Sequence, residues 1–205
     1  MYTQIAERCM AFEGSRCIAR GKMREVAVAV KAHIDSSPDA SILLFDEDTA
    51  HIVEVDFRGD ASDVLARIDG MLASAAAARD GAEKGEKERR GPGRPKLGVV
   101  SREVTLLPRH WEWLSTQPGG ASVTLRKLVE AARKANSGKD RIRSAQEITY
   151  RFMNAVGGDF PGYEEALRAL YAPDAARFAS LVAEWPEDVR EHVLRFARSA
   201  FAEEE

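Results

Sequence analysis

Alternating and helix-spaced apolar residues divide the first part of the chain into short elements. Residues 10–20 form strand-like stretches broken by Gly14, and residues 22–35 have apolar side chains at helical spacing. Residues 41–46 and 51–57 predict two strands of an antiparallel hairpin that is covered on one face. The apolar face of the predicted helix consists of Met23, Val26, Val30 and Ile34. The pattern is typical of a small α+β domain.

A second helix and then a polar segment follow the hairpin. Asp60 or Ser62 can cap this helix, which carries Val64, Leu65, Ile68 and Leu72 on its apolar face. Residues 79–98 contain five glycines, two prolines and almost no apolar side chains. Because such a segment buries too little surface to offset the entropy lost on ordering, it predicts a flexible linker. The α+β domain is therefore expected to span residues 1–78.

Residues 99–137 show a β-type run, a short helix, a glycine turn and a longer helix. The run stops at Pro108, which is tolerated at the first position of a helix, and Pro-Gly-Gly at 118–120 ends that helix. Trp111 is expected to face a core, and Ser122 is predicted as the N-cap of the second helix. The apolar face of the second helix consists of Leu125, Leu128, Val129 and Ala132.

Residues 138–205 predict short amphipathic helices joined by Pro and Gly turns. The first spans residues 139–157, Pro161-Gly162 opens the second, Asp174 caps the third and Pro186 begins the last. Such helices favour a compact α-helical bundle. The fold class is therefore α+β: a small α+β domain, a flexible basic linker, a central unit and an α-helical domain.

Charge is segregated along the chain as acidic, basic and acidic parts. The formal net charge is -6 over residues 1–88, +9 over 89–151 and -6 over 152–205. A concentrated positive field most often serves to bind a polyanion such as DNA. The alternative is that the basic centre packs against its acidic neighbours within the protein.

Residue types that carry chemistry are sparse. Cys9 and Cys17 have neither the number of a disulfide framework nor the spacing of a zinc site, which favours a reduced, cytoplasmic protein. No apolar run is long enough to span a membrane, and no signal peptide is apparent at the start. Motifs for a phosphate loop, a nucleophile elbow or a zinc protease are absent, so we expect no enzyme, cofactor or metal. The hairpin region carries acidic residues that are expected to be solvated: Asp46, Glu47, Asp48, Asp56 and Asp60.

Residues 102–135 resemble the ribbon-helix-helix (Arc/MetJ-type) DNA-binding unit. The likeness rests on Leu107-Pro108-x-x-Trp111-x-x-Leu114, Gly120-x-Ser122 and Leu125-Arg126-x-Leu128. It implies that two chains pair residues 102–107 as an antiparallel ribbon in the DNA major groove, and hence a homodimer. It also implies that the backbone N–H groups of Ser122 and Val123 grip a phosphate.

The register of the predicted strand stays open. In the register that the family uses, Arg102, Val104 and Leu106 face DNA and Glu103 is buried. Burial of an unpaired carboxylate is costly. The opposite register presents Thr105 to DNA, between Glu103 and Leu107. Neither face has a strong set of base-reading side chains, so phosphate contacts are the expected mode of binding.

A second DNA-binding element is predicted in the linker. Residues 89–96 resemble an AT-hook core, in which Gly93-Arg94-Pro95 would run along a narrow minor groove. The alternative is a basic, solvated linker. Together the two resemblances predict DNA contacts from Arg94, Lys96, Arg102, Thr105, Arg109, Ser122, Val123, Arg126 and Lys127.

Over nearly its whole length the chain resembles a family of bacterial proteins known only as a domain of unknown function. The likeness lies in residues 43–46, 55–59, 93–98, 103–114, 150–153 and 160–162. It implies a bacterial origin and no particular activity. The resulting hypothesis is a dimeric DNA-binding regulator or antitoxin-like repressor. The alternative is a non-enzymatic adaptor whose basic centre docks on an acidic protein partner.

Overall fold

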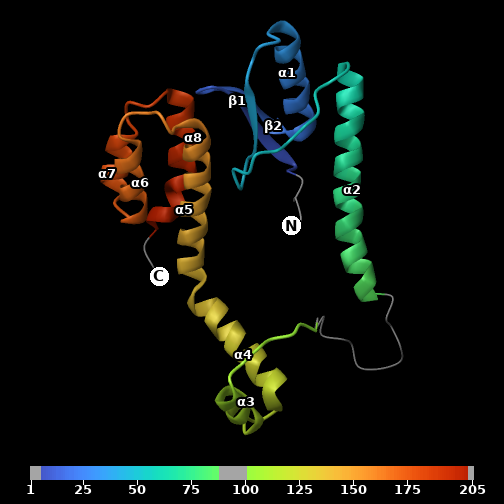
Figure 1. The fold of residues 1–205 in the computed structure, drawn as a ribbon, viewed down its shortest axis with the longest axis vertical. Helices are drawn as coiled ribbons and strands as arrows, with labels where there is room; N and C mark the ends of the chain where they lie inside the picture. Colours follow the sequence, from blue (N-terminus) through green and yellow to red (C-terminus); the bar gives the residue numbers. More distant parts are fainter. Residues whose placement is uncertain (1–5, 88–100, 203–205) are drawn as a thin grey trace. The chain divides into compact units, whose positions relative to one another are not determined.

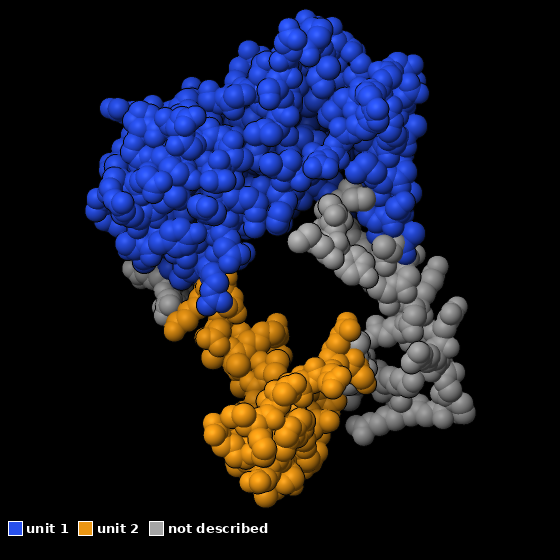
Figure 2. All heavy atoms as spheres, viewed as in Figure 1, with its two compact units in different colours: residues 1–82, 141–203 blue, residues 83–140, 204–205 orange. Residues whose placement is uncertain are grey.

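The chain forms two compact units (Figure 2). The computed structural model describes residues 6–87 and 101–202, with the side chains of residues 78–87 excepted. Unit 1 comprises residues 1–82 and 141–203, and unit 2 comprises residues 83–140 with the last two residues. In the described residues we find eight α-helices, one short 3-10 helix and a three-stranded antiparallel sheet (Figure 1).

The sheet of unit 1 has the order β2-β1-β3, with β1 (Arg8–Glu13) in the centre. β1 and β2 (Arg16–Lys22) form a hairpin whose turn contains Gly14 at φ +55, in the left-handed region that glycine adopts readily. β3 (Ile42–Asp46) pairs with the other edge of β1. Four consecutive residues of β1 are buried, so both faces of the central strand are covered.

Helices α1 (Met23–Ser36) and α2 (Ala61–Lys87) cover one face of the sheet (Figure 1). The predicted apolar stripe on α1 is confirmed for its first three residues, because Met23, Val26 and Val30 are all buried, and Ile34 is half-buried. They pack in one cluster with Cys9, Ala11 and Leu44 from the sheet and with Val64 and Ile68 from α2. The predicted cap of α2 is also confirmed: Asp60 Oδ1 accepts hydrogen bonds from Ser62 Oγ and from the backbone N–H of Asp63.

The C-terminal helices of unit 1 cover the other face of the sheet. They are α5 (Ser137–Val156), α6 (Tyr163–Tyr171), α7 (Ala175–Leu181) and α8 (Glu187–Ala197), followed by the 3-10 helix η1 (Arg198–Phe201). The predicted Asp174 cap of α7 is confirmed, since its side chain accepts a hydrogen bond from the backbone N–H of Arg177. The predicted start of α8 after Pro186 is confirmed as well.

One hydrophobic core joins the N-terminal and C-terminal segments, which the sequence predicts as separate domains at 1–78 and 138–205. Phe12 and Phe45 of the sheet contact Phe152 of α5, each with ring centroids 5.3 Å apart in edge-to-face geometry. The backbone N–H of Cys17 donates to Asp188 Oδ2 of α8 at 2.7 Å. Because successive residues of β1 point to opposite faces, an apolar β1 needs a helical layer on each side.

The predicted strand at 51–57 is wrong beyond its first residues. Ile52 forms an isolated bridge with Phe45, and the backbone N–H of Val53 donates to Leu44 O at 2.7 Å, after which no strand is assigned to residues 53–57. The chain instead turns along α2, where Arg67 donates to the carbonyl oxygens of Asp56 and Arg58. Hydrogen bonds from the Arg67 side chain thus take the place of the backbone hydrogen bonds that a paired strand would form.

Helix α2 continues into the predicted linker. The sequence ends the preceding domain at residue 78, whereas α2 extends to Lys87. Its second half is rich in Ala, Glu and Lys, which have high helix propensity and outweigh Gly81 and Gly85. The remainder of the predicted linker, residues 88–98, lies outside the described residues. Within the described ranges no helix is long and apolar enough to cross a membrane.

Candidate nucleic-acid interface

Unit 2 contains a pair of helices, α3 (Pro108–Ser115) and α4 (Gly120–Ala135). Leu107 has extended backbone angles, φ -66 and ψ 150, and Pro108 then begins α3 as the sequence predicts. Gly119 precedes α4 with φ +88, and a Cβ there would lie 3.2 Å from Val123. Both the backbone angle and the close contact require glycine at the turn.

The start of α4 differs from the prediction. Ser122 is predicted as the N-cap, but Gly119 occupies that position and the helix begins at Gly120, because the left-handed turn at Gly119 starts the helix three residues earlier. Helix geometry leaves the backbone N–H groups of Ala121 and Ser122 without an intrahelical acceptor. The N–H of Val123 falls opposite the carbonyl group of Gly119, the first acceptor of the helix. Ser122 therefore retains a free donor by this geometry, and Val123 does not.

Most apolar side chains of the α3–α4 pair are exposed. Leu114 is buried, with 2% of its surface exposed, and α4 has no buried residue at all. Trp111, predicted to face a core, is 44% exposed, because two short helices of a single chain cannot enclose it. The exposed apolar side chains are Val104, Leu107, Trp111, Trp113, Leu128 and Val129.

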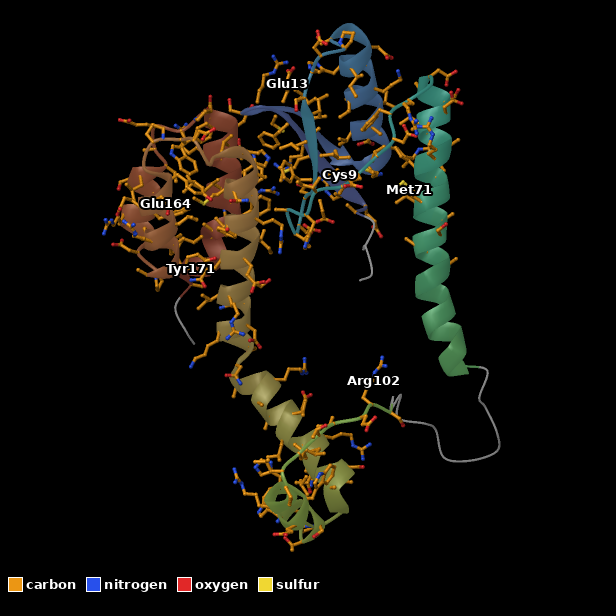
Figure 3. The ribbon with its side chains drawn as sticks, viewed as in Figure 1. Cys9, Glu13, Met71, Arg102, Glu164 and Tyr171 are labelled. Atoms are coloured by element: carbon orange, nitrogen blue, oxygen red, sulfur yellow. The ribbon has the colours of Figure 1, made fainter. Side chains whose placement is uncertain are left out.

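The predicted phosphate-binding side chains are available for contact. Arg102, which Figure 3 labels, Arg109, Arg126 and Lys127 are all exposed, and within the described residues they form no ion pair. Arg133 is engaged instead: its Nη2 lies 2.7 Å from Glu130 Oε1. The hydrogen bond between them lowers the pKa of Glu130 and raises that of Arg133.

Residues 101–107 have no strand assigned to them. Leu106 is half-buried, whereas Val104, Thr105 and Leu107 are exposed, so neither register of the predicted ribbon is favoured by burial. A ribbon needs a second strand, which a single copy of this segment does not supply. Arg94 and Lys96 lie outside the described residues.

A charge cluster in unit 1 was not predicted from the sequence. The carboxylate of Glu47, only 6% exposed, accepts hydrogen bonds from Arg8 Nε at 2.7 Å, Arg20 Nε at 2.6 Å and Arg195 Nη1 at 3.2 Å. Burial alone would raise the pKa of Glu47, but the bonds from Arg20 and Arg8 outweigh burial and lower it. We call these four residues the Glu47 cluster; it ties all three strand segments to α8.

The other carboxylates of the predicted acidic turn have separate structural partners. Asp46 Oδ1 accepts from the backbone N–H groups of Asp48 and Thr49, at 2.9 and 2.7 Å. Asp56 pairs with Arg58, whose hydrogen bond lowers the pKa of that carboxyl group. Glu47 was predicted to be solvated with them, but it points into the protein.

A buried histidine beside the Glu47 cluster was also missed. His192 lies on α8, its ring 5.2 Å from that of Phe12, and its Nδ1 donates to Asp188 O at 2.7 Å. Burial lowers the pKa of His192, and the nearby Arg195 and Arg20 lower it further. It is therefore a neutral core residue at pH 7. Val189 and Val193 are buried in the core, and His192 shares their helix face by helical spacing. This spacing could have predicted from the sequence that His192 is buried.

The architecture defines a mixed α+β protein in which a small sheet is layered between helices and a separate helix pair exposes an amphipathic face. A family model described as an uncharacterized protein conserved in bacteria (DUF2239) matches residues 8–197, so the chain belongs to this family. The predicted resemblance to a bacterial family is thereby confirmed. No curated protein and no solved structure matches the chain significantly.

Proposed function

We propose that the protein binds DNA as a dimer through residues 102–135 and acts as a transcriptional regulator or antitoxin-like repressor. One observation carries the proposal: α4 has no buried residue, although it has an apolar stripe and unpaired basic side chains on its other faces. A helix of this kind acquires a core when a second copy covers the stripe, and the basic side chains then remain free for phosphate.

The apolar stripe supports self-association. Leu128 and Val129 are 48% and 63% exposed, and Trp111 on the neighbouring helix is 44% exposed. Contiguous exposed apolar side chains usually mark an interface. A second copy would also supply the antiparallel partner for residues 102–107 that a ribbon requires. In this proposal, the contact that forms the dimer therefore also forms the ribbon.

Leu128→Asp is expected to convert the dimer into a monomer, because it places a carboxylate in the proposed interface. Sedimentation velocity on the full chain measures the change directly. Leu194→Asp is the matched control, since Leu194 is a 39% exposed leucine on α8. A wild type that sediments as a monomer at micromolar concentration would contradict the proposed interface.

The proposed contacts with DNA are to phosphate. Arg102, Arg109, Arg126 and Lys127 are exposed without ion pairs in the described residues, and the backbone N–H of Ser122 is free by helix geometry. Positive side chains together with a helix N-terminus favour a phosphate group. Arg94 and Lys96, in the AT-hook-like segment, would add contacts in a minor groove.

Arg126→Ala/Lys127→Ala is expected to weaken binding to duplex DNA on the order of ten-fold or more, because a dimer loses both charges from each copy. Fluorescence anisotropy with labelled duplexes of varied sequence measures it. The matched control is Arg16→Ala/Arg198→Ala, which removes two exposed arginines of unit 1 without described partners. Equal losses in both variants would mean that the effect depends on net charge alone.

The second candidate is an adaptor that docks its basic centre on an acidic protein. The acidic residues within unit 2 favour it, since Glu103, Glu112 and Glu130 dilute the positive charge. Salt weakens both kinds of complex, so salt alone does not separate them. A sequence-dependent footprint on DNA would support the regulator. Binding that any polyanion abolishes, with no footprint, would support the adaptor.

A further inference from the structure

A hollow in unit 1 lies where the sheet meets the first turn of α1 and the middle of α2. Its volume is about 560 Å³, a size that suits a small organic molecule. Met23, buried, and Leu72, half-buried, provide an apolar wall. The other lining residues are charged: Glu7, Arg8, Lys22, Arg24 and Glu25. All of them belong to unit 1, so the proposed DNA-binding residues of unit 2 take no part in the hollow.

Two of the basic lining residues lie directly opposite each other in the sheet. Arg8 of β1 and Lys22 of β2 are cross-strand partners in the antiparallel hairpin, so their side chains share one face. Like charges in such a pair repel and destabilise the sheet. Both residues are exposed, and within the described part of the chain Lys22 forms no ion pair. An anion between the two side chains would replace this repulsion with attraction.

Arg8 is held in place, but its charge is only partly balanced. Its Nε donates to Glu47 Oε2 at 2.7 Å, and the same carboxylate also accepts from Arg20 and Arg195. Three guanidinium groups and one carboxylate give the Glu47 cluster a formal charge of +2. Hydrogen-bond donors are also in excess, since Arg195 Nε is buried without a partner among the described residues. The bond through Nε leaves the Nη groups of Arg8, whose side chain is 54% exposed, available to a ligand.

The remaining charged residues around the hollow do not supply a further free cation. Arg24 forms an ion pair with Asp69 of α2. Glu25 adds a carboxylate near the end of β2, where its Oε2 lies 3.2 Å from the position that a Cβ on Gly21 would take. Arg8 and Lys22 are therefore the side chains that can hold an anion, and Glu25 opposes it.

We propose that the hollow binds a phosphate monoester, with its phosphate between Arg8 and Lys22 and its organic part against Met23 and Leu72. The two Nη groups of an arginine match the oxygens of a phosphate, and a lysine adds a compact point charge. A doubly charged phosphate gains more than a carboxylate from two opposed cations. The apolar wall favours a ligand with an organic part over free phosphate. Because every contact is within unit 1, this site is independent of the proposed DNA binding.

Isothermal titration calorimetry on the full chain at constant ionic strength tests the site, with phenyl phosphate as the probe. We expect one site per chain. Phenyl phosphate should bind about ten-fold more tightly than inorganic phosphate, which lacks the organic part, and than benzoate, which carries one negative charge. Absence of phenyl phosphate binding, or equal affinity for all three compounds, would overturn the proposal.

Charge substitutions at the two ends of β2 separate the site from general attraction of anions. Lys22→Gln is expected to weaken phenyl phosphate binding by about ten-fold. Arg16→Gln is the matched control, because it removes one exposed positive charge from the same strand but outside the hollow, and it should leave the affinity unchanged. Arg126→Ala/Lys127→Ala, in unit 2, should also leave it unchanged. Equal losses in Lys22→Gln and either control would contradict the assignment.

Two further variants test the apolar wall and the opposing carboxylate. Leu72→Ser is expected to weaken phenyl phosphate binding several-fold without changing the affinity for inorganic phosphate, since only the organic part contacts Leu72. Glu25→Gln is expected to strengthen binding of both phosphate compounds several-fold, because it removes a repelling charge. Leu72→Ser that weakens both compounds equally, or Glu25→Gln that weakens them, would count against the proposed position of the ligand.

Discussion

Phe152→Ala is expected to lower the free energy of unfolding by about 3–5 kcal/mol, the usual cost of removing a buried phenylalanine. Phe152 is fully buried on α5. Its ring contacts Phe12 and Phe45 from the sheet, and Phe196 from α8 at 5.4 Å. The substitution leaves a cavity where the N-terminal and C-terminal segments meet, so it should destabilise both together.

Modification of Cys9 measures whether the two segments unfold together. Cys9 is fully buried on the face of the sheet opposite Phe152, and burial, with help from Asp46 and Glu47, raises its pKa to about 12. In a Cys17→Ser background, its rate of reaction with a thiol reagent reports opening of the sheet. We expect Phe152→Ala to increase this rate in step with the loss of stability. An unchanged rate would mean that residues 1–78 fold as a domain of their own.

Glu47→Gln is expected to lower the free energy of unfolding by about 2–4 kcal/mol, because it leaves three arginines around a buried amide. The side chains of Arg8, Arg20 and Arg195 are 54%, 39% and 28% exposed, so water compensates for part of the lost attraction. Urea denaturation measures the difference. Glu54→Gln is the matched control, since Glu54 is exposed and has no described partner.

The loss in free energy of unfolding caused by Glu47→Gln should depend on pH. The pKa of Glu47 lies below its ordinary value of 4.5 in the folded protein, so the carboxylate stabilises the fold above that value. This contribution is lost as the pH falls through the folded pKa. The wild type and the variant should therefore differ most near neutral pH and converge in acid. A difference that stays constant down to pH values below the folded pKa would contradict the charge-based account.

Local patterns in the sequence were sufficient to predict most helices. Apolar spacing and capping residues act within one or two turns, so α1, the Asp60 cap of α2 and the Asp174 cap of α7 could be read directly. The Pro-Gly-Gly break in unit 2 was also local. The N-cap of α4 could not be predicted in this way, because the left-handed turn at Gly119 competes with capping by the side chain of Ser122.

Features that depend on distant residues could not be predicted. The N-terminal and C-terminal segments share a core because β1 is the central strand of the sheet and has a hydrophobic cluster on each of its two faces. This central position follows from the pairing of β1 with both β2 and β3. The Glu47 cluster brings together residues as far apart as Glu47 and Arg195, without any local pattern. For the candidate interface, the sequence indicated the exposed basic side chains. It also assigned Trp111 to a core, whereas this side chain is 44% exposed among the described residues.

A salt titration of the wild-type protein against duplex DNA tests the proposed function most directly. We expect binding at low salt, with the logarithm of affinity falling linearly against the logarithm of salt by roughly 0.9 per phosphate contacted. Arg126→Ala/Lys127→Ala should flatten the slope by roughly one unit for each lost contact. No binding of the wild type to DNA even at low salt would contradict the account, and the basic side chains of unit 2 would then require a protein partner.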